Sequence, residues 1–325
     1  MNNLGSDFKL VLGTLPFGGA VSSRESEAII VSAIENGLRD FDVAPLYGGG
    51  KAPRILGRAI RDYSEDVSIW GSIGLESRID PQSVFAVQVA NHTPAYLLSA
   101  IDQMLEMLDR DYIDVLNIHA FDPNTNFEQV YDFLLKMIEL GKVKELSYSN
   151  LLPHEFSEIE RVDIHQTISR IQLHGNLVEQ RLISEFAMLF VNSSRKIVCH
   201  RPFARGLLTR EYGPDNLRPI ESRSTRGWRL DRYLDQSFLK AVSELRSKIE
   251  NRGISATTAA LTWLKEQPKI AGAIFGVRSI PQLLDVISGL NSSKTLEVSS
   301  WLQPILVDVN LIDFAHSNPQ DYFEK

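Results

Sequence analysis

Three side chains that can exchange protons stand at the ends of apolar segments in this sequence. Asp42 and Tyr47 lie five residues apart, directly after one apolar run, and His119 follows a second apolar run at residues 113–118. Carboxylate, phenol and imidazole groups serve as general acids or bases when a fold brings them to a substrate. Each group alone has an ordinary structural explanation, but their common position at strand ends predicts a site of proton-transfer chemistry.

The elements that must position these groups alternate along the chain. Short apolar runs typical of strands are separated by segments with the i, i+3, i+4 spacing of amphipathic helices, as at residues 97–108 and 130–138. Eight such units predict an α/β fold in which residues 1–325 form a single-domain (β/α)₈ TIM barrel, with a doubly wound open sheet as the alternative. The predicted strands span residues 10–15, 39–43, 67–72, 113–119, 143–149, 170–173, 197–201 and 271–276.

Local signals at helix starts agree with this alternation. Ser22 and Glu25 have the spacing of a capping box, in which each side chain satisfies the other residue's backbone N–H. Thr93 followed by Pro94 is typical of an N-cap with proline at the first helical position. We therefore expect helices to begin directly after Ser22 and at Pro94.

Residues 203–235 interrupt the alternation. They show no clean period and are rich in glycine, proline and arginine. A long excursion after the seventh predicted strand is either a functional lid or a solvated insertion, and the sequence leaves both interpretations open.

Composition excludes several classes of partner. The net charge of −7 and the pI near 5.6 argue against binding to nucleic acid or to an anionic membrane surface. Cys199 is the only cysteine, so an internal disulfide is excluded and a reducing compartment is indicated. We expect a cytoplasmic protein, because the sequence has neither a signal-like N-terminus nor an apolar run of about 20 residues. The histidines lack metal-ligand spacing, so no metal is expected, and nothing identifies a protein partner.

Polar residues recur at the ends of the otherwise apolar predicted strands, and in a (β/α)₈ barrel the carboxyl ends of the strands carry the site. Besides the three groups above, this ring contains Ser72, Ser149, Asn150, Gln172, His174, His200, Arg201, Gly276 and Arg278.

Seven segments of the chain resemble the aldo-keto reductase family, in the family's order and spacing, and its bacterial sugar-dehydrogenase-like members most of all. They include FDVAPLYGGG, YIDVLNIHAFDP and AIFGVRSIPQL, and the seven lie at residues 10–19, 41–50, 112–123, 141–150, 171–176, 201–209 and 273–283. The resemblance covers nearly the whole chain. It implies the barrel fold and NADP(H)-dependent oxidation or reduction of a small molecule.

The resemblance also implies roles for individual residues. Tyr47 matches the group that gives a proton to the carbonyl oxygen, His119 the group that orients the carbonyl, and Asp42 the carboxylate that supports a catalytic lysine. The residues that match positions contacting the cofactor are Ser149, Asn150, Gln172, His200, Arg201, Gly276, Arg278, Ser279, Gln282 and Asp285. Among these, Arg278 could pair with a 2′-phosphate, so NADP(H) is expected in preference to NAD(H).

One departure from the family pattern affects the chemistry. The third predicted strand ends in Gly71-Ser72-Ile73-Gly74, so Ser72 stands where the family carries its lysine. A nearby cation favours the phenolate of a tyrosine, whose ordinary pKa is about 10, and serine provides no charge. Tyr47 is therefore expected to be a weaker acid–base group. Lys51 is a conceivable substitute cation, although a lysine after a turn is usually exposed.

Three functions fit these residues. The first is an NADP(H)-dependent oxidoreductase acting on a carbonyl or alcohol of a small polar or sugar-like molecule, with catalysis weakened by Ser72. The second is a non-redox lyase, dehydratase or epimerase that uses Asp42, Tyr47 and His119 for proton transfer. The third is a protein that binds nicotinamide nucleotide without turnover.

Overall fold

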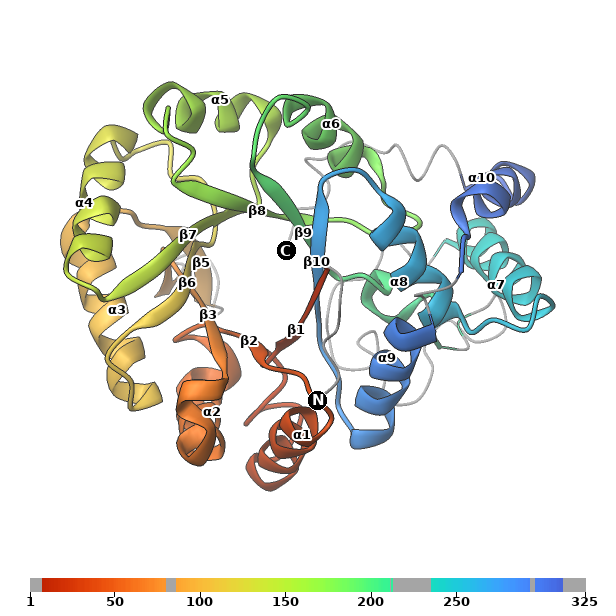
Figure 1. Ribbon diagram of the computed structural model, residues 1–325, viewed down its shortest axis with the longest axis horizontal. Helices are drawn as coiled ribbons and strands as arrows, with labels where there is room; N and C mark the ends of the chain where they lie inside the picture. The colour runs from red at the N-terminus through yellow and green to blue at the C-terminus, as the bar shows by residue number, and fades with distance from the viewer. Residues whose placement is uncertain (1–7, 80–85, 211, 213–234, 293–295, 312–325) are drawn as a thin grey trace.

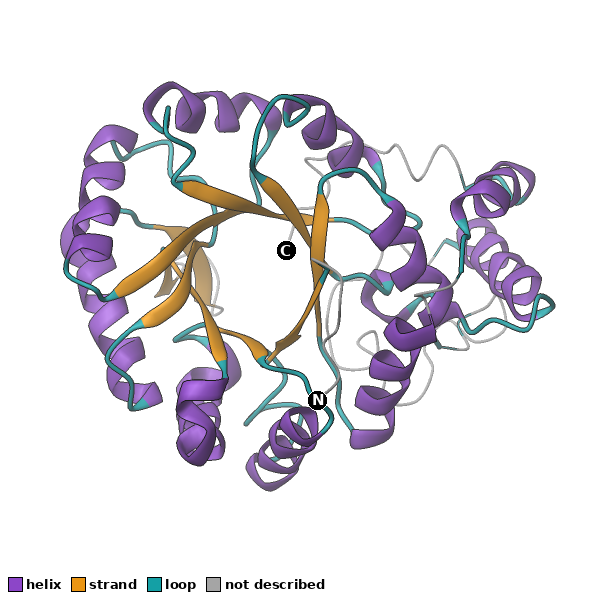
Figure 2. Cartoon of the chain, viewed as in Figure 1, coloured by secondary structure: helices purple, strands orange, loops and turns teal. Residues whose placement is uncertain are grey.

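The computed structural model describes residues 8–79, 86–210, 212, 235–292 and 296–311, and within them eight parallel strands close into a barrel. Figures 1 and 2 show the strands as an inner ring with helices around the outside. The predicted (β/α)₈ barrel is confirmed, and the open sheet is excluded because β10 pairs with β1. In their order around the barrel the strands are β1 (Lys9–Gly13), β2 (Asp40–Val43), β3 (Ser68–Ile73), β6 (Ile113–Ile118), β7 (Val143–Ser149), β8 (Ile168–His174), β9 (Lys196–His200) and β10 (Ile270–Phe275).

Each of the eight predicted strands is present, with ends displaced by at most two residues. The largest displacements are at Leu15, which lies beyond the end of β1 at Gly13, and at Ile168, where β8 begins before the predicted Arg170. An apolar run can continue past the last ladder hydrogen bond into the following loop, as at the exposed Leu15, so hydropathy alone does not fix a strand's end.

Helices follow the strands and cover the outside of the barrel. Helix α1 begins with the predicted capping box, in which Ser22 Oγ accepts from Glu25 N at 3.3 Å and Glu25 Oε2 accepts from Ser22 N at 3.2 Å. Helix α3 begins at Pro94 after Thr93, as predicted. The helices are α1 (Ser23–Glu35), α2 (Lys51–Ile60), α3 (Pro94–Leu108), α4 (Phe127–Glu139), α5 (Pro153–Val162), α6 (Arg181–Leu189), α7 (Gln236–Glu250), α8 (Ala256–Glu266), α9 (Ile280–Ser292) and α10 (Ser299–Asp308), with α7 and α10 together beside α8 (Figure 1).

A two-stranded antiparallel hairpin between β3 and α3 was not predicted. It consists of β4 (Leu75–Ile79) and β5 (Ala86–Ala90), with Leu75 opposite Ala90 and Ser77 opposite Gln88. Polar and apolar residues do not alternate cleanly along these strands, so the period-two signal is weak. Gly74 turns the chain out of β3 with a φ of +96° and starts the hairpin beside the barrel mouth.

The interior of the barrel is filled with side chains. Val11, Trp70, Val115, Val198 and Ile274 form a separate buried cluster, and each comes from a different barrel strand. Because side chains alternate along a strand, the residue two positions later on the same strand points to the same side. The residues two positions later are Gly13, Ser72, Asn117, His200 and Gly276. The apolar cluster therefore forms the floor beneath them.

Most of the predicted excursion at residues 203–235 lies outside the described residues, at 211 and 213–234. The two interpretations of it, a lid or a solvated insertion, concern those residues. Its first part is a 3₁₀ turn, Ala204–Gly206, followed by the buried Leu207 and Leu208. Among the described helices, none has the length and apolar composition needed to cross a bilayer.

Gly57 gives a test of how α2 packs on the barrel. A Cβ atom at this position would lie 2.8 Å from the carbonyl oxygen of Leu108, at the end of α3. We expect Gly57→Ala to reduce the free energy of unfolding by about 1–3 kcal/mol, although alanine by itself favours a helix by about 1 kcal/mol. Urea denaturation measures the change.

Arg54→Ala is the matched control, because Arg54 is exposed on the same helix. Its effect should stay within about 0.5 kcal/mol. A Gly57→Ala protein as stable as the unsubstituted one would show that the two helices are not in such close contact.

Candidate active site

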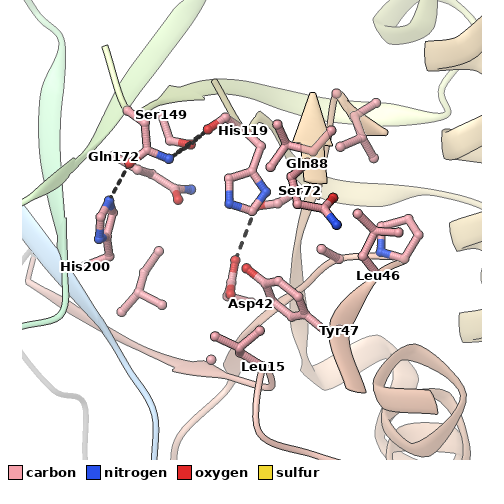
Figure 3. A pocket seen from close by; sticks show the side chains of 18 of the residues that line it. Leu15, Asp42, Leu46, Tyr47, Ser72, Gln88, His119, Ser149, Gln172 and His200 are labelled. Carbon is pink, nitrogen blue, oxygen red and sulfur yellow. Dashed lines mark hydrogen bonds between the residues drawn. The ribbon is translucent and has the colours of Figure 1, made fainter. Parts of the chain in front are cut away.

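The register of the barrel brings polar side chains from different strands to one level. Gly13 pairs with Asp42, Ser72 with Asn117, Ser149 with Gln172, and His174 with His200. These residues lie at or near the carboxyl ends of their strands, where the barrel opens into a cavity of about 510 Å³. Figure 3 shows Ser149, Gln172 and His200 on one side of the cavity, Tyr47, Leu46 and Gln88 on the other, and Asp42 and His119 between them.

The structure brings together most, but not all, of the predicted site residues. Those that line the cavity are Asp42, Tyr47, Ser72, His119, Ser149, Asn150, Gln172, His200, Arg201 and Gly276. The other four, Arg278, Ser279, Gln282 and Asp285, are not among the described residues lining it.

These four residues lie beyond β10, in the loop leading to α9 and on the helix itself. Arg278 N donates to Gln282 Oε1 at 2.9 Å, and Gln282 N donates to Ser279 Oγ at 3.5 Å, so the three residues shape the first turn of α9. Asp285 is exposed, accepts a hydrogen bond from Thr257 Oγ1 at 2.7 Å, and borders a separate hollow of about 390 Å³.

Asp42 is a buried carboxyl group whose side-chain partners are uncharged. Ser72 Oγ donates to Asp42 Oδ1 at 3.4 Å (Figure 3), and no described ion pair includes Asp42. Burial raises the pKa of Asp42 to about 7, and the hydrogen bonds from Ser72 and Tyr47 only partly oppose this rise. The group is therefore divided between its protonated and ionised forms near neutral pH.

Tyr47 reaches the cavity from a 3₁₀ turn, Tyr47–Gly50, between β2 and α2. The turn needs Gly48, whose φ is +60° and whose added Cβ would collide with the carbonyl oxygen of Phe17. Burial, the charge of Asp42 and a hydrogen bond to it all raise the pKa of Tyr47 well above its ordinary value. The phenol therefore holds its proton at neutral pH.

His119 faces Tyr47 edge-on, with ring centroids 6.4 Å apart and ring planes at 80°. Burial and the positive charge of Arg201 lower the pKa of His119 to about 4, so its imidazole is neutral and can donate one hydrogen bond. The backbone oxygen of His119 accepts from Ser149 Oγ at 2.9 Å and from Asn150 Nδ2 at 2.8 Å, which fixes the loop that carries the ring.

Asn117 is a buried residue that joins two of the lining residues, and the sequence analysis missed it. Its Nδ2 donates to Ser72 Oγ at 3.0 Å and to Ser149 Oγ at 3.1 Å, joining β3 to β7 across β6. An amide inside the apolar strand Ile113–Ile118 was the available signal, because a buried polar group requires partners. Several residues that do line the cavity were also missed, including Leu15, Gln88 and Tyr96, because they come from a loop, the hairpin and α3 and carried no such signal.

Amide groups opposite Tyr47 have the chemistry to hold a flat ligand that carries an amide. Gln172 is buried, and its Nε2 has no hydrogen-bond partner among the described residues. Asn150, in the left-handed conformation with a φ of 55°, contacts His200 Nε2 through Oδ1 at 2.9 Å. A buried donor without a partner calls for an acceptor from a ligand or water, and the carboxamide of a nicotinamide ring fits it.

Lys51 does not bring a cation into the cavity beside Asp42. It is exposed at the first residue of α2 and is not among the described residues that line the cavity. The one cationic side chain among the described lining residues is Arg201, which follows β9.

Comparison with known proteins assigns a family to this barrel. A family model described as "Aldo/keto reductase family" matches residues 9–300. Aldo-keto reductase YhdN of Bacillus subtilis (strain 168) is 24% identical over 312 residues, covering 92% of this chain and 91% of that protein.

Solved structures with the same fold cover almost the whole chain. Glycerol dehydrogenase AKR11B4 from Gluconobacter oxydans superposes with a TM-score of 0.78 at 22% identity, covering 95% of this chain and 93% of that one. An aldo/keto reductase from Klebsiella pneumoniae in complex with NADP and acetate superposes with a TM-score of 0.70 at 17% identity, covering 92% and 90%.

The raised pKa of Asp42 predicts a pH dependence of stability. A carboxyl group whose pKa rises on folding stabilises the native state when protonated, and this contribution is fully present below about pH 4 and lost as the pH rises through about 7. Asp42→Asn cannot ionise. Relative to the unsubstituted protein, its free energy of unfolding should therefore increase between about pH 4 and pH 8, by at most about 4 kcal/mol.

Urea denaturation across that pH range measures the difference. Asp111→Asn is the control, because Asp111 is exposed, and the difference between this variant and the unsubstituted protein should stay nearly constant. Parallel pH profiles for Asp42→Asn and the unsubstituted protein would mean that Asp42 does not titrate in this range.

Proposed function

The chain belongs to the aldo/keto reductase family of NAD(P)-dependent oxidoreductases, and we propose that it uses NADPH to reduce the carbonyl group of a small polar or sugar-like molecule. The observation that carries this proposal is the meeting of Asp42, Tyr47 and His119 on one cavity, opposite Gln172, whose Nε2 has no hydrogen-bond partner among the described residues. The same site would oxidise the corresponding alcohol in the reverse direction.

The cofactor would lie across the barrel mouth. Gln172, Ser149 and Asn150 offer the side chains that suit its carboxamide, His200 offers a ring face, and the loop after β10 offers Arg278 for the ribose phosphate. The Klebsiella pneumoniae structure of similar fold contains NADP, which supports this choice of cofactor. When bound, the reduced nicotinamide supplies the hydride, and the protein supplies position and protons.

Tyr47 would deliver the proton to the carbonyl oxygen, while the neutral ring of His119 donates a hydrogen bond that orients it. When Tyr47 loses its proton, it becomes a phenolate beside Asp42, and two negative charges so close together are unfavourable when Asp42 is ionised. A pKa near 7 lets Asp42 carry a proton in part of the population and return it to Tyr47. The two groups then act as one proton-donating pair.

Asp42 and Tyr47 would donate a proton less readily than a pair of the same groups with a cation beside it. Ser72 stands at the position where the family carries a lysine, and it offers Asp42 only a hydroxyl group at 3.4 Å. Without an ammonium group there, the pKa of Tyr47 is raised rather than lowered. We therefore expect turnover to be slower than in a reductase with the lysine, without being abolished, because positioning of the two reactants still contributes much of the rate enhancement.

A non-redox reaction is the second candidate, and the pKa of Asp42 favours it. A carboxyl group that titrates near neutrality, next to a phenol and an imidazole, can remove and return protons in a lyase, dehydratase or epimerase. A nucleotide-binding protein without turnover is a third possibility, in which Gln172 and Asn150 are used and Tyr47 is not.

Two measurements distinguish these functions. Fluorescence titration with NADPH reports binding, and loss of NADPH absorbance with a panel of small aldehydes, ketones and sugars reports reduction. Binding with consumption supports the reductase. Binding with no consumption for any compound would favour the third function, and absence of binding would favour the second.

Ser72→Lys tests the proposed origin of the weak catalysis. An ammonium group beside Asp42 should lower the pKa values of Asp42 and Tyr47 and raise kcat/KM for the reduced compounds by about 10- to 100-fold. Ser72→Met is the matched control, because methionine has a similar length and no charge. An equal rate for the two variants would show that charge at this position does not limit turnover.

Arg278→Gln tests the preference for NADP(H). A guanidinium group that binds the 2′-phosphate through charge-assisted hydrogen bonds contributes about 1.5–3 kcal/mol, which corresponds to about a 10- to 100-fold loss of affinity for NADPH on substitution. Affinity for NADH, which lacks that phosphate, should change little. Equal losses for both nucleotides, measured by fluorescence titration, would contradict the assignment.

A further inference from the structure

A chain of three side chains, two of them buried, ends at the cavity wall on the side of the barrel away from Ser72. Arg201, directly after β9, places its guanidinium Nη1 2.9 Å from Nδ1 of His174, at the end of β8. His174 Nε2 in turn contacts Glu179 Oε2. His174 and Glu179 are each 1% exposed, whereas Arg201 lines the cavity.

The direction of the hydrogen bonds in this chain follows from chemistry. A guanidinium group has only donors, so His174 Nδ1 must accept and cannot carry a hydrogen. The imidazole hydrogen is therefore on Nε2 and is donated to the carboxylate of Glu179. Burial, the largest cause, lowers the pKa of His174 to about 4, which agrees with a neutral ring in this tautomer.

A second set of contacts ties the same residues to the backbone. Asn176 Nδ2 donates to Glu179 Oε2 at 2.8 Å and to the backbone oxygen of Arg201 at 3.2 Å. Arg201 itself has a φ of 60°, a left-handed conformation that is uncommon for a residue with a side chain. Such strain persists only where surrounding contacts fix the residue, and it is often found at functional sites.

The charge at the end of this chain acts on the proton-transfer groups. Burial is the largest cause of the lowered pKa values of His119 and His200, and the charge of Arg201 lowers both further; Arg201 also partly opposes the rise in the pKa of Tyr47, which burial and Asp42 cause. Its positive charge therefore favours an anionic phenolate at Tyr47, which is the effect expected of the missing lysine.

We propose that Glu179 and His174 are positioning residues that hold the guanidinium of Arg201 at the cavity wall, where it supplies from β9 the positive charge that Ser72 does not supply from β3. The proposal deepens the proposed reductase function and rests on it for the role of Tyr47. It requires no new reactant, because Arg201 acts only through its charge.

The imidazole of His174 lies between the carboxylate of Glu179 and the guanidinium of Arg201 and keeps the two charges apart. A direct ion pair between Arg201 and the buried Glu179 would draw the guanidinium away from the cavity and into the protein. With His174 as a spacer, the carboxylate still compensates the cation through two hydrogen bonds, while the guanidinium stays at the wall.

Nitrogen NMR of the histidine rings tests the network without any turnover. We expect His174 to show a protonated Nε2 and an unprotonated Nδ1, and His119 to stay neutral until low pH. Arg201→Met should shift the titration midpoint of His119 upwards, and Arg201→Lys should shift it less. His174→Phe, which removes the acceptor for Arg201, should shift it in the same direction as Arg201→Met.

His154→Phe is the matched control, because His154 is exposed on α5 and the substitution is the same. It should leave the His119 midpoint unchanged. A His174 ring protonated on Nδ1, or an unchanged His119 midpoint in Arg201→Met, would overturn the proposal. Since Arg201→Met and the unsubstituted protein suffice for this comparison, failure of His174→Phe to fold would not prevent the test.

Kinetics then test the link to catalysis. With a compound that the protein reduces, Arg201→Met should lower kcat by about 10-fold, with a smaller loss in Arg201→Lys and none in His154→Phe. An unchanged kcat in Arg201→Met would refute the catalytic role of the charge. If NMR supports the network but no variant consumes NADPH, the positioning of Arg201 is retained, and the reductase function is the part that fails.

Discussion

The in-register closure of eight parallel strands is the constraint on which the site depends. Pairing of Ser72 with Asn117, Ser149 with Gln172, and His174 with His200 sets polar side chains from five strands near the mouth of the barrel. A shift of one residue in any of these pairs would turn that strand's polar side chain away from the cavity and an apolar one into it. The apolar cluster around Trp70 lies directly below and makes the opposite register costly.

Closure of the barrel buries the carboxyl group of Asp42 and thereby raises its pKa. Burial without a cation would be too costly for a permanently ionised carboxylate, and its partners Ser72 and Tyr47 compensate only in part. The barrel therefore holds a carboxyl group that gains and loses its proton near neutral pH. That property suits proton delivery to a carbonyl oxygen, and it equally suits a non-redox proton transfer. The protonation of Asp42 is therefore compatible with both functions.

Two hydrogen-bond networks flank the cavity, and they differ in charge. The network centred on Asn117 is neutral and joins Ser72 to Ser149. The network centred on His174 is charged and links the buried Glu179 to Arg201 at the wall. The positive charge of the site thus comes from the β8–β9 side, and the groups that exchange protons come from the β2 and β6 sides.

The sequence by itself determined the alternation of strands and helices, the helix starts at Ser22 and Pro94, and the set of strand-end residues that line the cavity, because apolar periodicity and capping are local. It did not determine the hairpin, the contacts of Asn117 or the network around His174. Ser72 and Asn117 are 45 residues apart, and Arg201 and His174 are 27 apart. Only closure of the barrel fixes which side chains on different strands meet, because the register between two strands depends on contacts around the whole ring.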